Sequence, residues 1–164
     1  MTTPAQKYDY TCYNQHDVLR LNWAYWAITL FLSRHVILFM LISVSAGRGG
    51  GGPRNPELAA LLDPILFVSD LPALMLLFLA GARLPKSGRN TRYLWRQGRY
   101  LLLMSSGLYI GLLLWQEHFD FARFDPVTWG LAALNMCLMI YVMKSGYLRD
   151  LFVQFPAPET EAGK

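Results

Sequence analysis

Charged residues are scarce in this 164-residue chain: Lys, Arg, Asp and Glu together make up 16% of it. Soluble domains usually contain about 25% of these residues. Hydrophobic residues make up 54% of the chain, and they gather in long blocks separated by short polar segments. This composition argues against an ordinary soluble domain and favours a bundle of membrane helices.

Cysteine is also scarce, and sequence motifs typical of enzymes are missing. The two cysteines, Cys12 and Cys137, lie far apart and no CxxC pair is present, so we expect neither a disulfide framework nor a cysteine-based metal site. The glycine run 49–52 lacks the GK[ST] ending of a phosphate-binding loop, and a turn between helices is the better interpretation. We therefore expect that the protein is not an enzyme and uses no cofactor.

Two polar segments contain residues that could act as an acid/base pair or as metal ligands. They are His16 with Asp17, and the group Glu117, His118, Asp120 and Asp125. Carboxylates and imidazoles suit a metal ion, but nothing in the sequence fixes their geometry. We interpret them as a solvated surface segment and a polar hairpin, and expect no metal site.

Four apolar stretches approach the ~20 helical residues that cross a bilayer. They cover about residues 21–44, 60–82, 100–115 and 127–143, with Leu58 and Pro64 as alternative starts for the second. We predict an all-α membrane protein with four transmembrane helices in one domain, residues 1–150, and a flexible cytoplasmic tail, residues 151–164. The first stretch is too long for the core of a signal peptide, so it is expected to remain as an anchor.

Residues 83–99 form a basic segment between the second and third stretches. Arg89, Arg92, Arg96 and Arg99 follow one another at i, i+3, i+7 and i+10, so on one continuous helix they would share a face. Interleaved aromatic residues are typical of a segment at the membrane surface. We expect this face to contact the anionic headgroups of the lipid bilayer. No nucleic-acid recognition motif accompanies it, so we expect no nucleic-acid partner.

The basic residues are distributed unevenly between the two sides that four spans would define. Eleven lie on the side of the termini, and the three on the other side are Arg48, Arg54 and Arg123. Because Lys and Arg are enriched in cytoplasmic segments, we predict cytoplasmic termini and a location in the bacterial inner membrane.

Arg34 lies near the middle of the first apolar stretch, where an arginine costs roughly 2.5–3.5 kcal/mol on insertion scales. Asp70 lies at a similar depth in the second stretch, which should run antiparallel to the first. We predict a buried Arg34–Asp70 ion pair, with Ser33, Ser69 or Asn135 as further partners. Arginine suits such a site because it can engage a carboxylate with two parallel hydrogen bonds.

His35 follows Arg34 by one residue and therefore points ~100° away around the helix. It could face a second helix, the lipid interface or a partner subunit. Arg34, His35 and Asp70 could form a proton relay, because ionisable residues in membranes often mark ion pathways. A structural clamp between two helices is favoured, because one charge pair gives no continuous polar path.

The third and fourth stretches contain features that suit helix packing. Gly107 and Gly111 form a GxxxG pair, which lets another helix backbone approach closely. Asn135, near the centre of the fourth stretch, is expected to be buried and to hydrogen-bond across helices. With Arg34, His35 and Asp70 it completes the predicted buried polar cluster.

The N-terminal part of the chain resembles a family of small bacterial inner-membrane proteins that have four predicted spans and no assigned function. The resemblance lies in residues 13–47: the polar segment Tyr13–Leu21, Trp26, the stretch Phe31–His35 and Phe39. Arg20 takes the position of the family's lysine, and His35 takes that of its aromatic residue. The resemblance implies architecture and location, and brings no catalytic residues.

Three functions remain open. The favoured one is a non-enzymatic accessory or assembly subunit that packs against itself, as a homo-oligomer, or against a larger membrane partner. The alternative is a small transporter or channel subunit that uses Arg34, His35 and Asp70. A membrane enzyme that holds lipid phosphate on the arginine face ranks last, because no nucleophile or acid/base pair accompanies that face.

Overall fold

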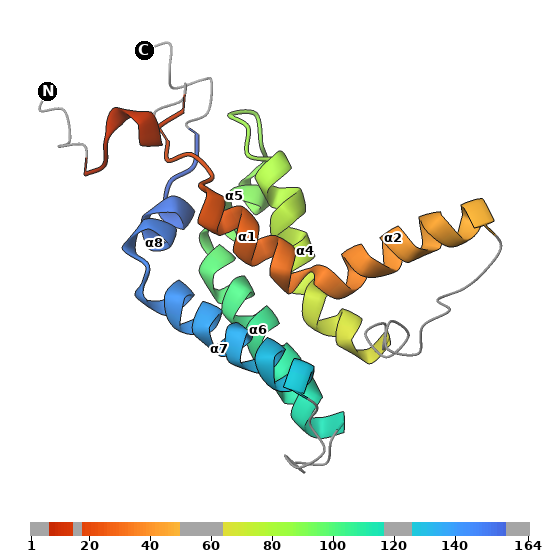
Figure 1. The fold of residues 1–164 in the computed structure, drawn as a ribbon. Helices are drawn as coiled ribbons and strands as arrows, with labels where there is room; N and C mark the ends of the chain where they lie inside the picture. Colours follow the sequence, from red (N-terminus) through yellow and green to blue (C-terminus); the bar gives the residue numbers. More distant parts are fainter. Residues whose placement is uncertain (1–6, 15–17, 50–63, 117–125, 157–164) are drawn as a thin grey trace, which may run out of the picture.

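The computed structural model describes residues 7–14, 18–49, 64–116 and 126–156. Across these residues the secondary structure consists of seven α-helices, two short 3-10 helices and an isolated β-bridge between Tyr13 and Leu19 (Figure 1). The all-α prediction is confirmed. Two helices are long and apolar enough to cross a membrane, or three candidate spans exist if a bent helix pair counts as one. The structure thus provides two to three of the four predicted spans.

The first apolar stretch is a broken helix. α1 (Trp23–Leu32) and α2 (Arg34–Gly49) meet at Ser33, and their axes differ by 71°. The prediction of one continuous helix over 21–44 is therefore wrong. The break has local causes in α1: the Thr29 hydroxyl donates to the Tyr25 carbonyl, a back-bond that bends helices, and Ser33 leaves the helical conformation.

The second stretch forms the short central helix α4 (Phe67–Gly81), which follows the 3-10 helix η2 (Pro64–Leu66). α4 packs most extensively against α6 and also contacts α1, α2 and α5, so it lies at the centre of the molecule (Figure 1). Its 15 residues rise about 22 Å, less than the ~30 Å of a hydrocarbon core. The predicted start at residue 60 lies outside the described residues.

The third and fourth stretches lie in the two longest helices. α6 (Gly98–Gln116) and α7 (Pro126–Lys144) each have 19 residues and are the two candidate spans. α6 packs against both α4 and α7, while α7 contacts mainly α6. α7 buries only Asn135 and Val142, and most of its residues are exposed.

The remaining helices, α5 (Arg89–Arg96) and α8 (Gly146–Val153), pack together at one end of the bundle. Leu151 and Phe152 are fully buried there, and the Trp95 indole donates to the Leu151 carbonyl at 3.1 Å. The flexible tail predicted from residue 151 is therefore wrong for its first residues, because their apolar side chains join the core. Residues 157–164 lie outside the described part of the chain.

The N-terminal segment is fastened to this same end. The Tyr8 hydroxyl and the Lys7 amine both donate to the Asp150 carboxylate, at 2.8 and 2.7 Å. These two donors hold the pKa of the Asp150 carboxyl below its usual value. The Arg83 guanidinium donates to the Leu19 and Gln154 carbonyls, and burial lowers its pKa to about 10, so it remains charged at neutral pH.

The core at this end is a cluster of three aromatic rings. Trp95 and Phe152 lie 5.1 Å apart between ring centroids, and Tyr25 of α1 lies about 6 Å from each of them. Gly98, at the start of α6, has no side chain, and the Phe152 ring of this cluster packs directly against it. A Cβ atom at Gly98 would lie 2.2 Å from Cε1 of Phe152.

We predict that Gly98→Ala destabilises the fold by about 1–3 kcal/mol, because the added methyl group overpacks the ring of Phe152. Gly130→Ala is the matched control, since a Cβ atom there has nothing within 4 Å. The free energy of unfolding in detergent micelles measures both effects. Equal stability of the two variants would contradict the packing at Gly98.

Candidate functional site

The buried carboxylate of Asp70 is the centre of the candidate site. Asp70 lies in the first turn of α4 and is 0% exposed. Its Oδ1 lies 2.8 Å from Nδ1 of His35, which is 2% exposed, and its Oδ2 accepts a hydrogen bond from the Val36 amide at 3.0 Å. One side chain of α4 therefore holds the first turn of α2.

This carboxylate performs the task of a helix N-cap from another helix. The first amides of a helix have no acceptor within that helix, and leaving them unpaired away from water is costly. Ser33, at the break, is fully buried, and its hydroxyl makes no hydrogen bond among the described residues. Asp70 supplies the acceptor instead, and its negative charge is favoured at the N-terminus of α2.

Arg34 has different partners from the predicted one. Its Nη1 donates to the Phe31 carbonyl at 3.1 Å, and its guanidinium carbon lies 4.5 Å from the Phe31 ring and 4.2 Å from the Tyr109 ring. The predicted Arg34–Asp70 ion pair is therefore wrong, because the basic side chain next to Asp70 is that of His35. The bend at Ser33 explains the difference, because it turns the first residues of α2 so that His35 meets Asp70.

Tyr109 of α6 completes this part of the site. Its ring stacks on the His35 ring at 5.7 Å between centroids and also lies under the Arg34 guanidinium. Stacking on an aromatic face stabilises a guanidinium in apolar surroundings. Tyr109 was not among the predicted site residues, although an aromatic residue with a polar tip inside an apolar stretch is a usable signal.

Two serines connect α4 to its surroundings near Asp70. The Ser69 hydroxyl donates to the Leu66 carbonyl, and the Ser105 hydroxyl of α6 donates to the Ser69 carbonyl, each at 2.6 Å. Pro72 has no amide hydrogen, so the Val68 carbonyl lacks the donor that it would have in a regular helix. Ser69 was among the predicted partners, whereas Ser105 was missed because a serine in an apolar stretch has no distinctive spacing.

Asn135 lies apart from this network. Its side chain is 0% exposed on α7, and neither its Nδ2 nor its Oδ1 has a hydrogen-bond partner within the described ranges. The structure thus brings His35 and Asp70 together, places Arg34 beside them through Tyr109, and gives no hydrogen bond between Asn135 and the other three.

The four arginines of the predicted lipid face are in two different situations. Arg89 and Arg96 are exposed. Arg92 donates to the Ser87 and Pro85 carbonyls, and Arg99 donates to the Val142 and Met143 carbonyls at the end of α7. The helix is also interrupted at Gln97, between α5 and α6. The four side chains therefore do not share one continuous helix.

The possible metal ligands can be compared with the structure only in part. No cluster of three or more His, Cys, Asp or Glu side chains suited to a metal occurs among the described residues. The possible ligands Glu117, His118, Asp120 and Asp125 lie outside those residues, as do His16 and Asp17, which were considered as an acid/base pair.

These features define an all-α protein with two to three candidate membrane spans and a buried His35–Asp70 pair at a helix break. The sequence matches the family described as "Protein of unknown function (DUF2919)" over residues 8–154, so the chain belongs to this family. The match extends well beyond residues 13–47, where the resemblance was noted, and assigns neither an activity nor a number of spans. No curated protein and no solved structure matches the chain.

We predict that Asp70 and His35 are energetically coupled. Asp70→Asn should cost about 3–5 kcal/mol of unfolding free energy, because it breaks a buried pair. In a double-mutant cycle with His35→Gln, the coupling should be about 0.5–3 kcal/mol, as for residues in contact. Denaturant unfolding in detergent micelles measures both quantities.

A parallel cycle between Asp70→Asn and Arg34→Gln is the control for this prediction. Coupling that is stronger with Arg34 than with His35 would restore the Arg34–Asp70 pair and contradict the observed geometry.

Proposed function

We propose that the protein is an integral protein of the bacterial inner membrane, with four crossings and both termini in the cytoplasm. In this proposal it acts as a non-enzymatic accessory or assembly subunit. The broken pair α1–α2, α4, α6 and α7 provide the four crossings. The exposed GxxxG face of α6 is the observation on which the assembly role depends.

The outward surface of α7 supports a membrane location. Large apolar side chains cover it at many exposed positions, including Trp129, Leu134, Ile140 and Tyr141. Soluble monomers rarely expose contiguous apolar patches larger than a few hundred Å². A hydrocarbon environment removes this cost for a helix whose backbone bonds are internal.

The arrangement of the chain ends supports an even number of crossings. Tyr8 and Asp150 are hydrogen-bonded, so the segments before α1 and after α7 lie at the same end of the bundle. α5, between α4 and α6, contacts α8 at that end as well. A chain that leaves this end twice and returns twice makes four crossings. The eleven basic residues on this side favour the cytoplasm for it.

The GxxxG face of α6 supports an assembly role. Gly107 and Gly111 are exposed, and a Cβ atom at either position would have nothing within 4 Å. Tyr100, Met104 and Trp115 are exposed at spacings that place them on the same face. The packing of α6 against α4 and α7 leaves this face uncovered among the described residues. Such a face allows a helix of another subunit to approach closely.

We predict that Gly107→Ile with Gly111→Ile markedly lowers the assembled fraction, because the added side chains prevent the close backbone approach that a GxxxG face allows. Native mass spectrometry after gentle detergent extraction measures the assembled fraction, whether the partner is a second copy or another membrane protein. Gly130→Ile is the matched control, since Gly130 is an exposed helical glycine on α7 with equally open surroundings.

An unchanged assembled fraction in the α6 variant would contradict the assembly role of this face. Equal losses in the α6 variant and in the Gly130 control would do so as well, because they would show a general effect of bulk on a lipid-facing surface.

A small transporter or channel subunit remains the second candidate, because His35 and Asp70 are ionisable groups buried at a broken helix. Helix breaks at membrane depth recur at the ion and substrate sites of transporters. The accessory role is favoured because both carboxylate oxygens of Asp70 already have partners within the chain.

Liposomes containing the purified protein separate these two candidates. Under the accessory role, we predict that proton flux driven by a pH difference stays at the level of protein-free liposomes. A proton flux that Asp70→Asn abolishes while this variant stays folded would support the transporter and contradict the accessory role. The same flux should survive in the control variant Asp150→Asn.

A further inference from the structure

The joint between α1 and α2 interrupts a stretch that can form one continuous helix. No glycine or proline occurs between residues 21 and 46, so the local sequence does not forbid a helix there. In an unbroken helix, the amides of Arg34, His35 and Val36 would donate to the carbonyls four residues earlier. In the structure, none of the three donates to a backbone carbonyl of the described residues, although the helical bonds on either side of them are kept. The break therefore removes three helical hydrogen bonds.

Two side chains replace part of what the break removes. The Asp70 carboxylate accepts from the Val36 amide at 3.0 Å. The Arg34 guanidinium donates to the Phe31 carbonyl at 3.1 Å, and in an unbroken helix this carbonyl would accept from the His35 amide. A straight helix would exchange these side-chain contacts for the three backbone bonds. The joint thus has two alternative forms, each with its own set of hydrogen bonds.

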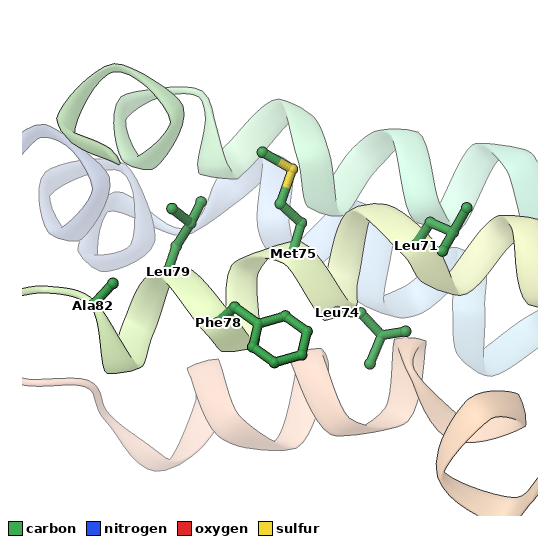
Figure 2. A pocket seen from close by; sticks show the side chains of 6 residues that line it. All are labelled: Leu71, Leu74, Met75, Phe78, Leu79 and Ala82. Carbon is green, nitrogen blue, oxygen red and sulfur yellow. The ribbon is translucent and has the colours of Figure 1, made fainter. Parts of the chain in front are cut away.

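α2 is held to the rest of the molecule mainly near the joint. Its chief contacts are with α4, where the Phe39 and Phe67 rings lie 5.5 Å apart between centroids. Further along, three apolar side chains of α2 are 60–63% exposed: Met40, Leu41 and Val44. α1, in contrast, lies alongside α4, and Leu74 and Phe78 of α4 point toward it, whereas α2 turns away from this line (Figures 1 and 2). The direction of α2 can therefore change while the core around α1 stays intact.

The two forms of the joint cross different thicknesses of bilayer. A straight helix from Trp23 to Val44 would rise about 32 Å, close to the ~30 Å of a typical hydrocarbon core. With the observed 71° between the two axes, the same residues advance only about 20 Å along the axis of α1. An apolar helix that does not match the bilayer costs free energy that grows with the mismatch. Thin bilayers therefore favour the bent form, and thick bilayers favour the straight form.

We propose that the α1–α2 joint is a hinge regulated by bilayer thickness, bent in thin bilayers and straight in thick ones. Asp70 makes the bent form available, because it pairs with His35 and accepts from the Val36 amide. This proposal rests on the membrane location given above, with α1 and α2 as one crossing, and does not depend on the assembly role. The regulating property is the length of the lipid chains, and no particular headgroup is required.

Spin-label distances in nanodiscs test the hinge with the full-length protein. One label is attached at Val44→Cys on α2 and the other at Val153→Cys on α8, both exposed positions, after the native cysteines have been replaced by serine. The Tyr25 and Phe152 rings are in contact, so α8 lies beside the start of α1. Straightening should therefore lengthen the distance between the labels by about 6 Å. We expect the shorter distance in phosphatidylcholine with chains of about 14 carbons and the longer one with chains of about 22 carbons.

A second pair of labels, away from α2, is the control. Cys137 of α7 is exposed and can be labelled together with Val153→Cys when Cys12 is replaced by serine. Both labels then lie on helices that the hinge does not move. The distance between them should be the same in the two lipids.

Two substitutions at Ser33 examine the hinge and leave Asp70 unchanged. Alanine favours a helix interior, whereas glycine disfavours an interior and is accepted at a helix start. Ser33→Ala should therefore raise the ratio of straight to bent form above that of Ser33→Gly, by about fourfold. The Ser33 hydroxyl has no hydrogen-bond partner in the described part of the chain, so neither variant loses a bond. Ser43→Ala and Ser43→Gly are the matched controls, because the exposed Ser43 lies within α2 in both forms.

The contrary outcomes are distinct. An unchanged distance between Val44 and Val153 in both lipids would show a rigid joint and would overturn the hinge while leaving the membrane location intact. A change that the control pair shares would show deformation of the whole bundle and would overturn the hinge as well. Failure of the chain to enter discs of either lipid would remove the membrane location, and the proposed function itself would fail.

Discussion

The hydrogen bonds of the Asp70 carboxylate with the first turn of α2 hold the helix break on which the arrangement of the bundle depends. One oxygen pairs with His35 and the other receives the Val36 amide, so α4 fixes both the position and the direction of α2. Without an acceptor at this point, the first turn of α2 would expose unpaired amides in an apolar interior, which is costly. The 71° bend between α1 and α2 therefore depends on the Asp70 carboxylate of α4, which accepts a hydrogen bond at this point.

Around this break, polar side chains bond to backbone groups of neighbouring helices. Ser105 of α6 donates to the Ser69 carbonyl beside the Pro72 turn, and Tyr109 of α6 contacts both His35 and Arg34. Three helices are thus connected through polar groups at one depth of the bundle. At the centre of these contacts both oxygens of the Asp70 carboxylate have partners within the chain, which is why we favour a clamp over an ion pathway.

The sequence predicted the positions of α6 and α7 because each is a continuous apolar block with polar residues at its ends. It did not predict the break at Ser33, because the residues on both sides form helix well and the acceptor that permits the break lies in α4. For the same reason the partner of Asp70 was misassigned: a continuous helix would have turned His35 away. The tail was misjudged because its start was placed inside α8: Leu148, Leu151 and Phe152 recur at i, i+3 and i+4, the spacing of one helix face. The aromatic residues that cover this face come from α1 and α5.

The contact between Tyr8 and Asp150 joins residues 142 positions apart. During synthesis, the segment before α1 therefore cannot find its final partner until nearly the whole chain has emerged from the ribosome. α8 depends on the earlier segments in turn, since Arg83 and Leu19 bind Gln154. Closure of this end of the bundle is thus a late step of folding, and until then the residues before α1 lack the partners on α8 that hold them in the finished structure.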